Sequence, residues 1–403
     1  MNVLIVSQYY PPEGVTIPAE IAQGLAERGH DVKVLTGFPN YPEGKVFPGY
    51  SQRWRSTEHD GDVEILRVPL LADHSNSIVR RVLNYASFAL SSASAGRYAK
   101  GADIIYVYAT QMTPALGPWL WRKPYVLHVQ DLWPDSILES SMVEQSRLGG
   151  IIRTVLNPWL RRVYARAAAV IGIAPTMVDT LIRRGAVGSR ISLVYNWADD
   201  AAAEQAVMKE KDSEQTRILF AGNVGDMQDL PTVIRAAHLA GDTVQVTILG
   251  DGIARPAAME LAEALGCENV SFLGRVPRED MAGYYAEADF SLVTLKDLKV
   301  FRGTIPSKFQ ASIANGVPVI STVQGNLRTL VDDLRLGFAT DGENPEALVE
   351  VFRVAGDMPT DEYRELRNRT HRVYLENFSR RAGLDAVEAV LASAINNDIT
   401  KDN

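Results

Sequence analysis

Short apolar runs alternate with stretches of helical periodicity along almost the whole chain. This alternation is typical of βα units with parallel strands, so it predicts an α/β fold. In the first half we predict strands at residues 3–7, 32–36, 63–68, 104–108, 125–129, 170–173 and 191–194. The pattern restarts in the second half, with strands predicted at residues 217–221, 244–249, 270–273, 290–294, 317–321 and 337–340.

The segment between the two halves, residues 198–216, is rich in Ala, Glu, Asp and Lys and has little apolar periodicity, which indicates a linker. A chain of 403 residues suits two α/β domains of about 150–200 residues each. We therefore expect an N-terminal domain over residues 1–197 and a C-terminal domain over residues 198–378, with a cleft between them. The tail from about residue 359 predicts two further helices.

Charge and cysteine content narrow the functional classes. The formal net charge of −8 argues against nucleic acid as a partner, so any phosphate must be bound by local groups. The single cysteine, Cys267, permits no intramolecular disulfide and fits a cytoplasmic setting. The first residues, MNVLIVSQYY, predict a strand rather than a signal peptide, and no apolar window is long enough to predict a spanning helix.

A proline-rich turn with Gly14 follows the first predicted strand and precedes a helix from about Ile17, with Thr16 as its expected cap. Ligands of α/β proteins bind at this end of the strands. Backbone N–H groups at the helix start could hold a diphosphate or a sugar hydroxyl, and Gly14 would allow close approach. A tight turn with no ligand accounts for the same residues equally well.

His128 and Asp131 lie in YVLHVQDLWPDS, at the end of another apolar strand. We expect both to emerge at the carboxyl edge of the sheet and to face the cleft. Neutral imidazole can exchange hydrogen bonds with a sugar hydroxyl, and a carboxylate can bind hydroxyls or orient the imidazole. The alternative is a histidine with a purely structural role.

Three glycine-rich turns follow strands of the second half. The first, AGNVGDMQDL, contains Gly222, Asn223 and Gly225 before a helix, and suits an anion at the helix start. The others predict backbone contacts to a base and ribose, through Gly250 and Gly252 in one turn and Gly274 and Val276 in the next. Each turn alone is weak evidence, because glycine is also ordinary at strand ends.

The segment VFRGTIPSKFQASIANGVPVIS places Arg302, Ser307 and Lys308 before or at the start of a helix. Two cations beside a helix N-terminus favour an anion, since the dipole, the free N–H groups and the fixed charges act together. A solvated basic loop is the alternative.

Residues 77–100 predict an amphipathic helix, with Ile78, Val82, Tyr85 and Phe88 on one side and basic residues near its start. Such a helix can lie on a membrane. A second basic and aromatic stretch covers residues 153–166. Segments of this kind are more usually packed helices that have solvated faces.

Together these segments resemble the GT4 family of glycosyltransferases, in particular bacterial members that build surface polysaccharides. The resemblance spans nearly the whole chain and rests on YYPPEG at 9–14, HVQDLWPDS at 128–136, AGNVGDMQDL at 221–230 and IPSK at 305–308 followed by ANGVPVIS at 314–321. It implies a GT-B fold, in which two Rossmann-like domains with parallel sheets face each other across a cleft. It also implies a nucleotide-sugar donor held by the C-terminal domain, an acceptor held by the N-terminal domain, and no metal ion or other cofactor.

The resemblance further implies roles for single residues. Gly14 would approach the donor phosphates, His128 would contact the donor sugar, and Arg302 and Lys308 would neutralise the diphosphate. The last helix, residues 379–403, would complete the N-terminal domain. Two departures stand out: the family's paired glutamates fall on Gly303 and Ala311, and its usual Arg and Lys of the first glycine-rich turn fall on Asn223 and Gln228. Ribose contacts would then come from Gln310 or Ser312, or be weaker.

The leading hypothesis is therefore a retaining transferase. It would move a sugar, with an N-acetylated amino sugar expected, from a UDP donor to a glycan or polyprenyl-linked acceptor in surface polysaccharide biosynthesis. Peripheral contact with the inner face of the membrane stays open. The alternatives are a soluble natural-product acceptor, a nucleotide-sugar epimerase, and a non-catalytic nucleotide-sugar binder.

Overall fold

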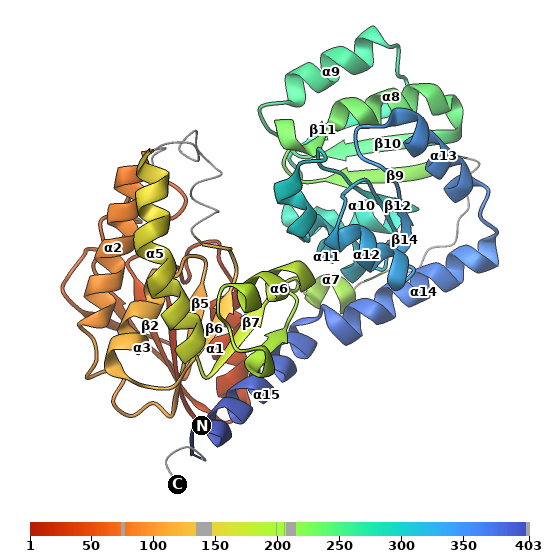
Figure 1. The fold of residues 1–403 in the computed structure, drawn as a ribbon. Helices are drawn as coiled ribbons and strands as arrows, with labels where there is room; N and C mark the ends of the chain where they lie inside the picture. Colours follow the sequence, from red (N-terminus) through yellow and green to blue (C-terminus); the bar gives the residue numbers. More distant parts are fainter. Residues whose placement is uncertain (74–76, 134–146, 199, 205, 207–214, 400–403) are drawn as a thin grey trace. The chain divides into compact units, whose positions relative to one another are not determined.

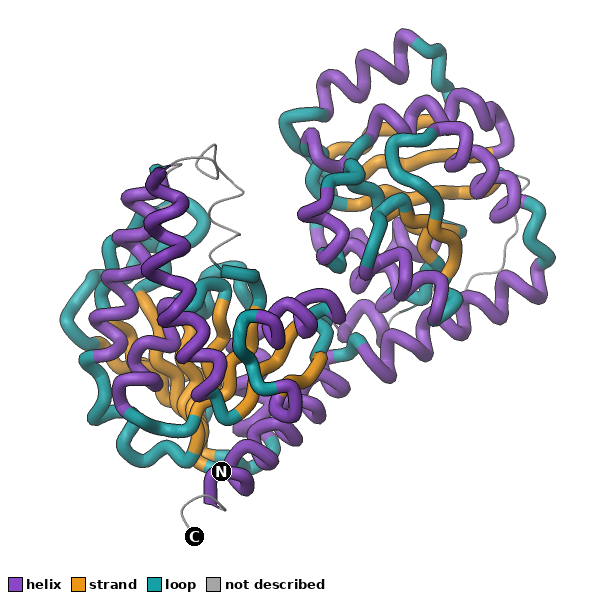
Figure 2. Tube along the Cα trace, in the orientation of Figure 1, coloured by secondary structure: helices purple, strands orange, loops and turns teal. Residues whose placement is uncertain are grey.

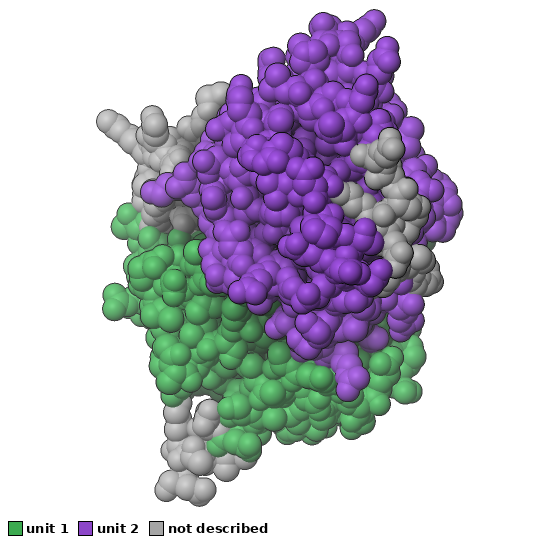
Figure 3. Space-filling view, turned by 90° about the vertical axis from the view of Figure 1, so that its right-hand side faces the viewer, with its two compact units in different colours: residues 1–195, 384–403 green, residues 196–383 purple. Residues whose placement is uncertain are grey.

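A computed structural model describes residues 1–73, 77–133, 147–198, 200–204, 206 and 215–399. The chain divides into two compact units, coloured separately in Figure 3: unit 1 comprises residues 1–195 and 384–403, and unit 2 comprises residues 196–383. The sequence-based boundaries, after residues 197 and 378, lie within a few residues of these limits. No helix among the described residues is long and apolar enough to cross a membrane.

Unit 1 is built on an eight-stranded sheet with strand order β3-β4-β2-β1-β5-β6-β7-β8. Helices pack on the sheet, as Figures 1 and 2 show. The strands are β1 Asn2–Ser7, β2 Asp31–Gly37, β3 Ser56–Asp60, β4 Val63–Val68, β5 Ile104–Ala109, β6 Tyr125–Val129, β7 Ala169–Gly172 and β8 Ile191–Leu193. The helices are α1 Ile17–Glu27, α2 Ile78–Ala93, α3 Leu116–Trp121, α5 Arg147–Arg166 and α6 Pro175–Arg183, with most of α15 Arg380–Ile399.

The central strands of unit 1 are buried along their whole length. Every residue of β5 and β6 is buried, and so are five of the six residues of β1. A parallel strand covered by helices on both faces reads as a continuous apolar run, which is why these strands could be predicted from sequence.

Strand β3 corrects the prediction of a wholly parallel sheet. It pairs antiparallel with β4 through a two-residue turn at residues 61–62, where Gly61 has φ +57°. Its sequence, STEHD, is polar, and none of its residues is buried. Neither face of this edge strand has to pack against an apolar surface. Its residues therefore carry no hydrophobic pattern from which the strand could be predicted.

The last helix packs on α1 within unit 1. Leu384 lies so close to Gly24 that a Cβ on residue 24 would meet its side chain at 2.4 Å. The Arg28 guanidinium donates to Asp385 and Glu388 at 2.6 Å each, and Glu388 also pairs with a ring nitrogen of His30 at 2.7 Å. These contacts fix residues 384–399 on the surface of unit 1.

Unit 2 contains a six-stranded parallel sheet with strand order β11-β10-β9-β12-β13-β14. The strands are β9 Thr216–Ala221, β10 Val244–Leu249, β11 Val270–Gly274, β12 Phe290–Val293, β13 Val319–Ser321 and β14 Gly337–Ala339. The helices are α7 Asp200–Glu204, α8 Leu230–Ala240, α9 Arg255–Ala264, α10 Met281–Glu287, α11 Ser307–Ala314, α12 Asn326–Asp333, α13 Pro345–Gly356 and α14 Thr360–Asn377. Strand β13 begins two residues later than predicted, after Pro318, which has no N–H for the ladder.

The strand order of unit 2 creates a point where the chain changes direction across the sheet. Strand β9 lies between β10 on one side and β12 on the other, all three parallel. Their carboxyl ends therefore meet at one edge, next to the helices and loops that follow them. In open α/β sheets such a switch point is where ligands bind.

Candidate functional site

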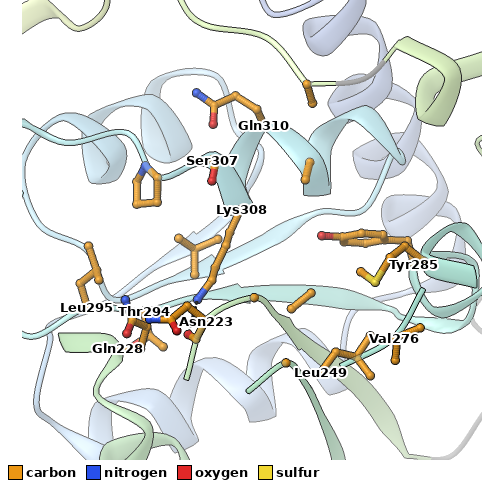
Figure 4. Close-up of a pocket in the computed structure, with 18 of the residues that line it drawn as sticks. Asn223, Gln228, Leu249, Val276, Tyr285, Thr294, Leu295, Ser307, Lys308 and Gln310 are labelled. Atoms are coloured by element: carbon orange, nitrogen blue, oxygen red, sulfur yellow. Dashed lines mark hydrogen bonds between the residues drawn. The ribbon is translucent and has the colours of Figure 1, made fainter. Parts of the chain in front are cut away.

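A cavity of about 940 Å³ opens at this edge of the unit 2 sheet (Figure 4). It lies between the carboxyl ends of β9, β10 and β12 and the N-terminal turns of α11. The lining residues come from these elements, from α10, from the segments that follow β10, β11 and β12, and from residues 197–198, all within unit 2. Those that carry the chemistry are Gly222, Asn223, Gln228, Gly250, Arg275, Val276, Tyr285, Thr294, Ser307, Lys308, Gln310 and Ala311.

Lys308, the second residue of α11, brings a positive charge into this cavity (Figure 4). Its Nζ lies 3.7 Å from the centroid of the Phe220 ring and donates to the carbonyl oxygen of Asn223 at 3.4 Å. The side chain is half-buried, and this desolvation lowers the pKa of the Lys308 ammonium to about 8. A desolvated cation beside the free N–H groups of a helix start is a site for an anion.

Gly222 makes room for this lysine. Its φ is +137°, and a Cβ added to it would lie 2.4 Å from Cε of Lys308. Gly250, with φ +122°, stacks against the same turn, because a Cβ there would lie 1.8 Å from the carbonyl oxygen of Gly222. Gly252 in turn approaches the carbonyl oxygen of Val224, with an added Cβ only 2.2 Å away.

These distances change the interpretation of the glycines. The sequence predicted that Gly250 and Gly252 contact a base and ribose, but in unit 2 the space beside them is filled by neighbouring backbone. Gly225 donates its N–H to the side-chain oxygen of Gln228 at 2.9 Å, so this N–H is already used. Gly225, Gly252 and Gly274 do not belong to the cavity lining, whereas Gly222 and Gly250 do.

The two ends of the cavity differ in polarity, as Figure 4 shows. Asn223, Gln228 and Thr294 lie at one end, beyond the Lys308 ammonium. The opposite end is an apolar wall of Ala221, Leu249, Val276, Met281, Tyr285 and Ala311, which belong to one hydrophobic cluster or pack against it. Lys308 therefore lies between an end where three polar side chains gather beside Leu295 and an end formed mainly by apolar side chains.

Arg302 lies outside the lining, contrary to its predicted role beside Lys308. It is exposed and forms a two-pronged ion pair with Asp297, from Nε at 3.0 Å and from Nη2 at 2.8 Å. The arginine that does reach the rim of the cavity is Arg275, which is 85% exposed and lies 3.9 Å from Asp251. The signal for Arg275 in the sequence is its position between Gly274 and Val276, which were both predicted to contact the nucleotide.

The two predicted ribose contacts on α11 are in different surroundings. Gln310 lines the cavity and is 6% exposed, and its side-chain oxygen has no hydrogen-bond partner. Ser312 is fully buried outside the lining, where its hydroxyl is bonded to the Ser291 hydroxyl and to the Lys308 carbonyl at 2.6 Å each. Ser312 is therefore committed to the core of unit 2.

In unit 1, the turn after β1 is organised by a residue that the sequence analysis did not single out. Glu13 is buried, and its carboxylate accepts backbone N–H groups of Tyr10, Asn40 and Tyr41 at 2.8–3.0 Å. It thereby ties the loop after β1 to the loop after β2. Gly14 beside it is exposed with open space around it. Thr16 is the N-cap residue of α1, as predicted, but its side chain makes no capping hydrogen bond.

His128 is fully buried in β6, which corrects the prediction that it faces a cleft. Its Nδ1 is hydrogen-bonded to the Tyr106 hydroxyl, its Nε2 has no partner, and its ring meets those of Tyr106 and Tyr108 edge to face. Burial lowers the pKa of His128 to about 3, so the imidazole is neutral at physiological pH. Asp131, two residues beyond the strand, is exposed.

Two family models match this chain in succession. The glycosyl transferase 4-like domain matches residues 14–197, and the glycosyl transferases group 1 domain matches residues 215–355. The first corresponds to unit 1 and the second to the cavity-bearing part of unit 2. The chain belongs to the GT4 glycosyltransferases.

Full-length relatives agree with this assignment. The GT4 chain is 27% identical over 386 residues to an Escherichia coli K12 protein described as a colanic acid biosynthesis glycosyl transferase, WcaI, covering 89% of this chain and 93% of that protein. Two solved structures share the GT-B fold at 16% identity. Sucrose-phosphate synthase from Thermosynechococcus elongatus has a TM-score of 0.69 over 98% of this chain and 99% of that one, and Anabaena HepE with UDP and glucose has 0.64 over 98% and 100%.

Within this GT4 enzyme the structure gathers Gly222, Asn223, Gly250, Val276, Ser307, Lys308 and Gln310 around one cavity in unit 2. Gly14, His128 and Asp131 belong to unit 1, and each unit is described by itself. Among the described residues, no group of three or more His, Cys, Asp or Glu side chains is arranged to hold a metal ion.

Proposed function

We propose that this glycosyltransferase moves a sugar from a nucleoside diphosphate donor, with UDP as the expected carrier, to a hydroxyl of a glycan or polyprenyl-linked acceptor in surface polysaccharide biosynthesis. The donor would bind in the unit 2 cavity and the acceptor in unit 1. The anomeric configuration of the sugar would be retained, and an N-acetylated amino sugar is the expected substrate.

The observation that carries this proposal is Lys308 at the start of α11, half-buried over Phe220 at the switch point of the unit 2 sheet. Breaking the bond between sugar and diphosphate leaves a new negative charge on the departing oxygen. The Lys308 ammonium and the free N–H groups of α11 would stabilise that charge. Their location in a partly desolvated cavity strengthens the interaction relative to bulk water.

Charge compensation by these groups would make a divalent ion unnecessary. We therefore propose that the reaction is metal-independent. The acceptor hydroxyl would attack the anomeric carbon from the face that the diphosphate leaves, and the diphosphate oxygen would take up its proton.

His128 has no part in this proposal as a group that touches the donor sugar, because both of its ring nitrogens are enclosed in unit 1. Asp131 is the remaining candidate of that segment for binding acceptor hydroxyls, since the residue is exposed, while partial desolvation raises the pKa of its carboxyl. Gly14 is also exposed, and its backbone is open to a ligand.

The similar proteins support UDP as the nucleotide of the donor and a surface polysaccharide as the product. HepE was solved with UDP and glucose and also with UDP-glucose, which favours UDP for a chain of the same fold. WcaI is described as acting in colanic acid biosynthesis, which favours a surface polysaccharide as the product.

We also propose peripheral contact with an anionic membrane through α2. Val79, Leu83 and Leu90 are spaced by four and seven residues, share one helix face, and are 61%, 49% and 68% exposed. The neighbouring Arg80 is exposed as well, which suits anionic lipid headgroups. This face differs from the predicted one, because Phe88 is fully buried. Leu83→Glu with Leu90→Glu should reduce flotation with phosphatidylglycerol vesicles, whereas unchanged flotation would refute this contact.

A transfer assay tests the proposed function. The enzyme is incubated with UDP-, GDP- and dTDP-sugars, a polyprenyl-diphosphate acceptor and membrane extract, with EDTA present or absent. Release of nucleoside diphosphate is followed together with the anomeric proton signals of the product. We expect transfer with retention from a UDP-sugar, unaffected by EDTA and lost in Lys308→Met.

Other outcomes contradict the proposal in distinct ways. Conversion of the donor sugar without release of diphosphate would indicate an epimerase. Tight donor binding without any turnover would indicate a non-catalytic binder. Transfer to a soluble aglycone but to no lipid-linked glycan would replace the proposed acceptor class.

A further inference from the structure

The polarity of the unit 2 cavity assigns an orientation to the donor, if the proposed function holds. The diphosphate lies at Lys308 and Ser307, where the charge and the free N–H groups are. A hexose needs hydrogen-bond partners for its hydroxyls, which the end with Asn223, Gln228 and Thr294 offers. A flat, weakly hydrated base suits the apolar wall formed with Leu249, Val276 and Tyr285 at the other end.

This orientation places the ribose beside Ala311. Residue 311 is three positions beyond Lys308 and four beyond Ser307, so it lies one turn further along the same face of α11. It lines the cavity and packs against the apolar wall. The ribose, between diphosphate and base, therefore meets a methyl group on this helix.

The polar side chains nearest to this position are already engaged or point elsewhere. Tyr285 is buried, and its hydroxyl lies beside that of Ser312, which is bonded to Ser291 and to the Lys308 carbonyl. The Gln310 carboxamide is directed toward the Ser307 end of α11, away from the Tyr285 end (Figure 4). Trp197 packs its ring so tightly on Gly383 that an added Cβ there would lie 2.3 Å away. Among the described lining residues the carboxylate is that of Asp251, which follows β10 rather than lying on α11 and is paired with Arg275 at 3.9 Å.

We propose that this cavity makes no hydrogen bond to the 2′-hydroxyl of the donor ribose. It would therefore bind ribonucleoside and 2′-deoxyribonucleoside diphosphate sugars with similar affinity. A site that hydrogen-bonds a substrate hydroxyl rejects the analogue that lacks it, because the site's own polar groups are then left unpaired. Where the hydroxyl faces a methyl group, its removal leaves no polar group of the protein without a hydrogen-bond partner, so the deoxy analogue is not rejected. The donor class is thereby extended from UDP-sugars to their deoxyribose counterparts, such as dTDP-sugars.

Isothermal titration of the full-length enzyme with UDP and dUDP tests this inference, because these ligands differ only in the 2′-hydroxyl. We expect dissociation constants within threefold of each other. UDP binding threefold or more tighter than dUDP would overturn the inference and leave the proposed donor site intact. Binding of neither nucleotide would contradict the proposed function itself.

A variant that should gain selectivity for UDP provides a second test of this inference. Ala311→Glu places a carboxylate where we locate the ribose and should make the enzyme prefer UDP over dUDP by tenfold or more. Ala311→Leu is the matched control, which enlarges the side chain without an acceptor and should weaken both nucleotides equally. An unchanged ratio in Ala311→Glu, with an unfolding temperature like that of the parent, would show that the ribose lies elsewhere.

Discussion

The Lys308 side chain passes directly beneath Gly222, with its Cε 2.4 Å from the point that a Cβ on residue 222 would occupy. The positive charge of the site and the glycine of the first turn are thus two parts of one arrangement. The glycine has φ +137°, which side chains rarely adopt, and the lysine uses the space that the missing Cβ leaves. The resulting position keeps Nζ over the Phe220 ring.

Gly222→Ala should therefore remove nucleotide binding by displacing Lys308. We expect the dissociation constant for UDP to rise at least tenfold, and the unfolding free energy to fall by about 1–3 kcal/mol because of the backbone strain. Titration calorimetry and urea unfolding measure the two effects. Gly283→Ala in α10 is the control, since an added Cβ there has nothing within 4 Å and should change neither quantity adversely. A Gly222→Ala enzyme with parental UDP affinity would refute the coupling.

The pH dependence of donor binding should follow the ammonium of Lys308. Burial lowers its pKa to about 8, so the group is charged at pH 7 and loses its proton as the pH rises past about 8. Bound diphosphate favours the charged form and shifts this loss upward. UDP affinity should therefore fall above pH 8, by at most about tenfold per pH unit. A Lys308→Met enzyme should show weak binding with no such decline between pH 7 and pH 9.

Removing the same charge should stabilise the empty protein. The pKa of Lys308 is lower in the folded than in the unfolded protein. Below the folded-state pKa the buried charge therefore destabilises the folded protein to its full extent, and this destabilisation disappears as the pH rises through the unfolded-state pKa. At pH 7 Lys308→Met should raise the unfolding free energy of nucleotide-free enzyme by on the order of 1 kcal/mol. Saturating UDP should reverse the order of the two proteins in a thermal unfolding experiment, because UDP binds the parent more tightly and stabilises it more. A nucleotide-free variant less stable than the parent would contradict the cost of burying this charge.

Arg302 gives a prediction opposite to the one from sequence. Its guanidinium is occupied by Asp297 and lies outside the cavity lining. Arg302→Ala should weaken UDP binding less than threefold, far less than Lys308→Met. Asp297→Asn serves as the control, because it releases the guanidinium without deleting it. Equal losses in the Arg302 and Lys308 variants would return Arg302 to the diphosphate site.

The parts of the fold that were predictable are those with a continuous physical signal. Strands such as β5 and β6 are buried on both faces and are apolar throughout, whereas the polar edge strand β3 has no such pattern. Lys308 could be anticipated because it lies at the start of a helix that precedes an apolar strand. The contacts of Glu13 with residues 40 and 41 could not, since backbone contacts between distant segments leave no local trace in sequence. Asp297 lies only five residues before Arg302, but the loop conformation that pairs the two side chains has no hydrophobic pattern that predicts it.

His128 illustrates the same limit and yields a stability prediction. A histidine at the end of a strand suggests a cleft, but the register of β5 and β6 encloses it between Tyr106 and Tyr108. Its pKa is lowered to about 3, so its stabilising contribution is complete above the unfolded value and is lost as the pH falls toward 3. Between pH 7 and pH 5 the parent should lose about 2 kcal/mol more than His128→Leu in urea unfolding. Tyr106→Phe keeps the imidazole and should show the same dependence of the unfolding free energy on pH as the parent. If the parent and His128→Leu showed equal pH dependence, the His128 ring would have to take up a proton in the folded protein.

The central claim is that the unit 2 cavity binds the diphosphate of a nucleotide-sugar donor through Lys308. Titration calorimetry of UDP into the parent enzyme and into Lys308→Met, at pH 7 in the presence of EDTA, tests it most directly. We predict one binding site per chain in the parent and a loss of affinity of at least thirtyfold in the variant. UDP binding of equal strength to both proteins would contradict the claim and place the donor outside this cavity.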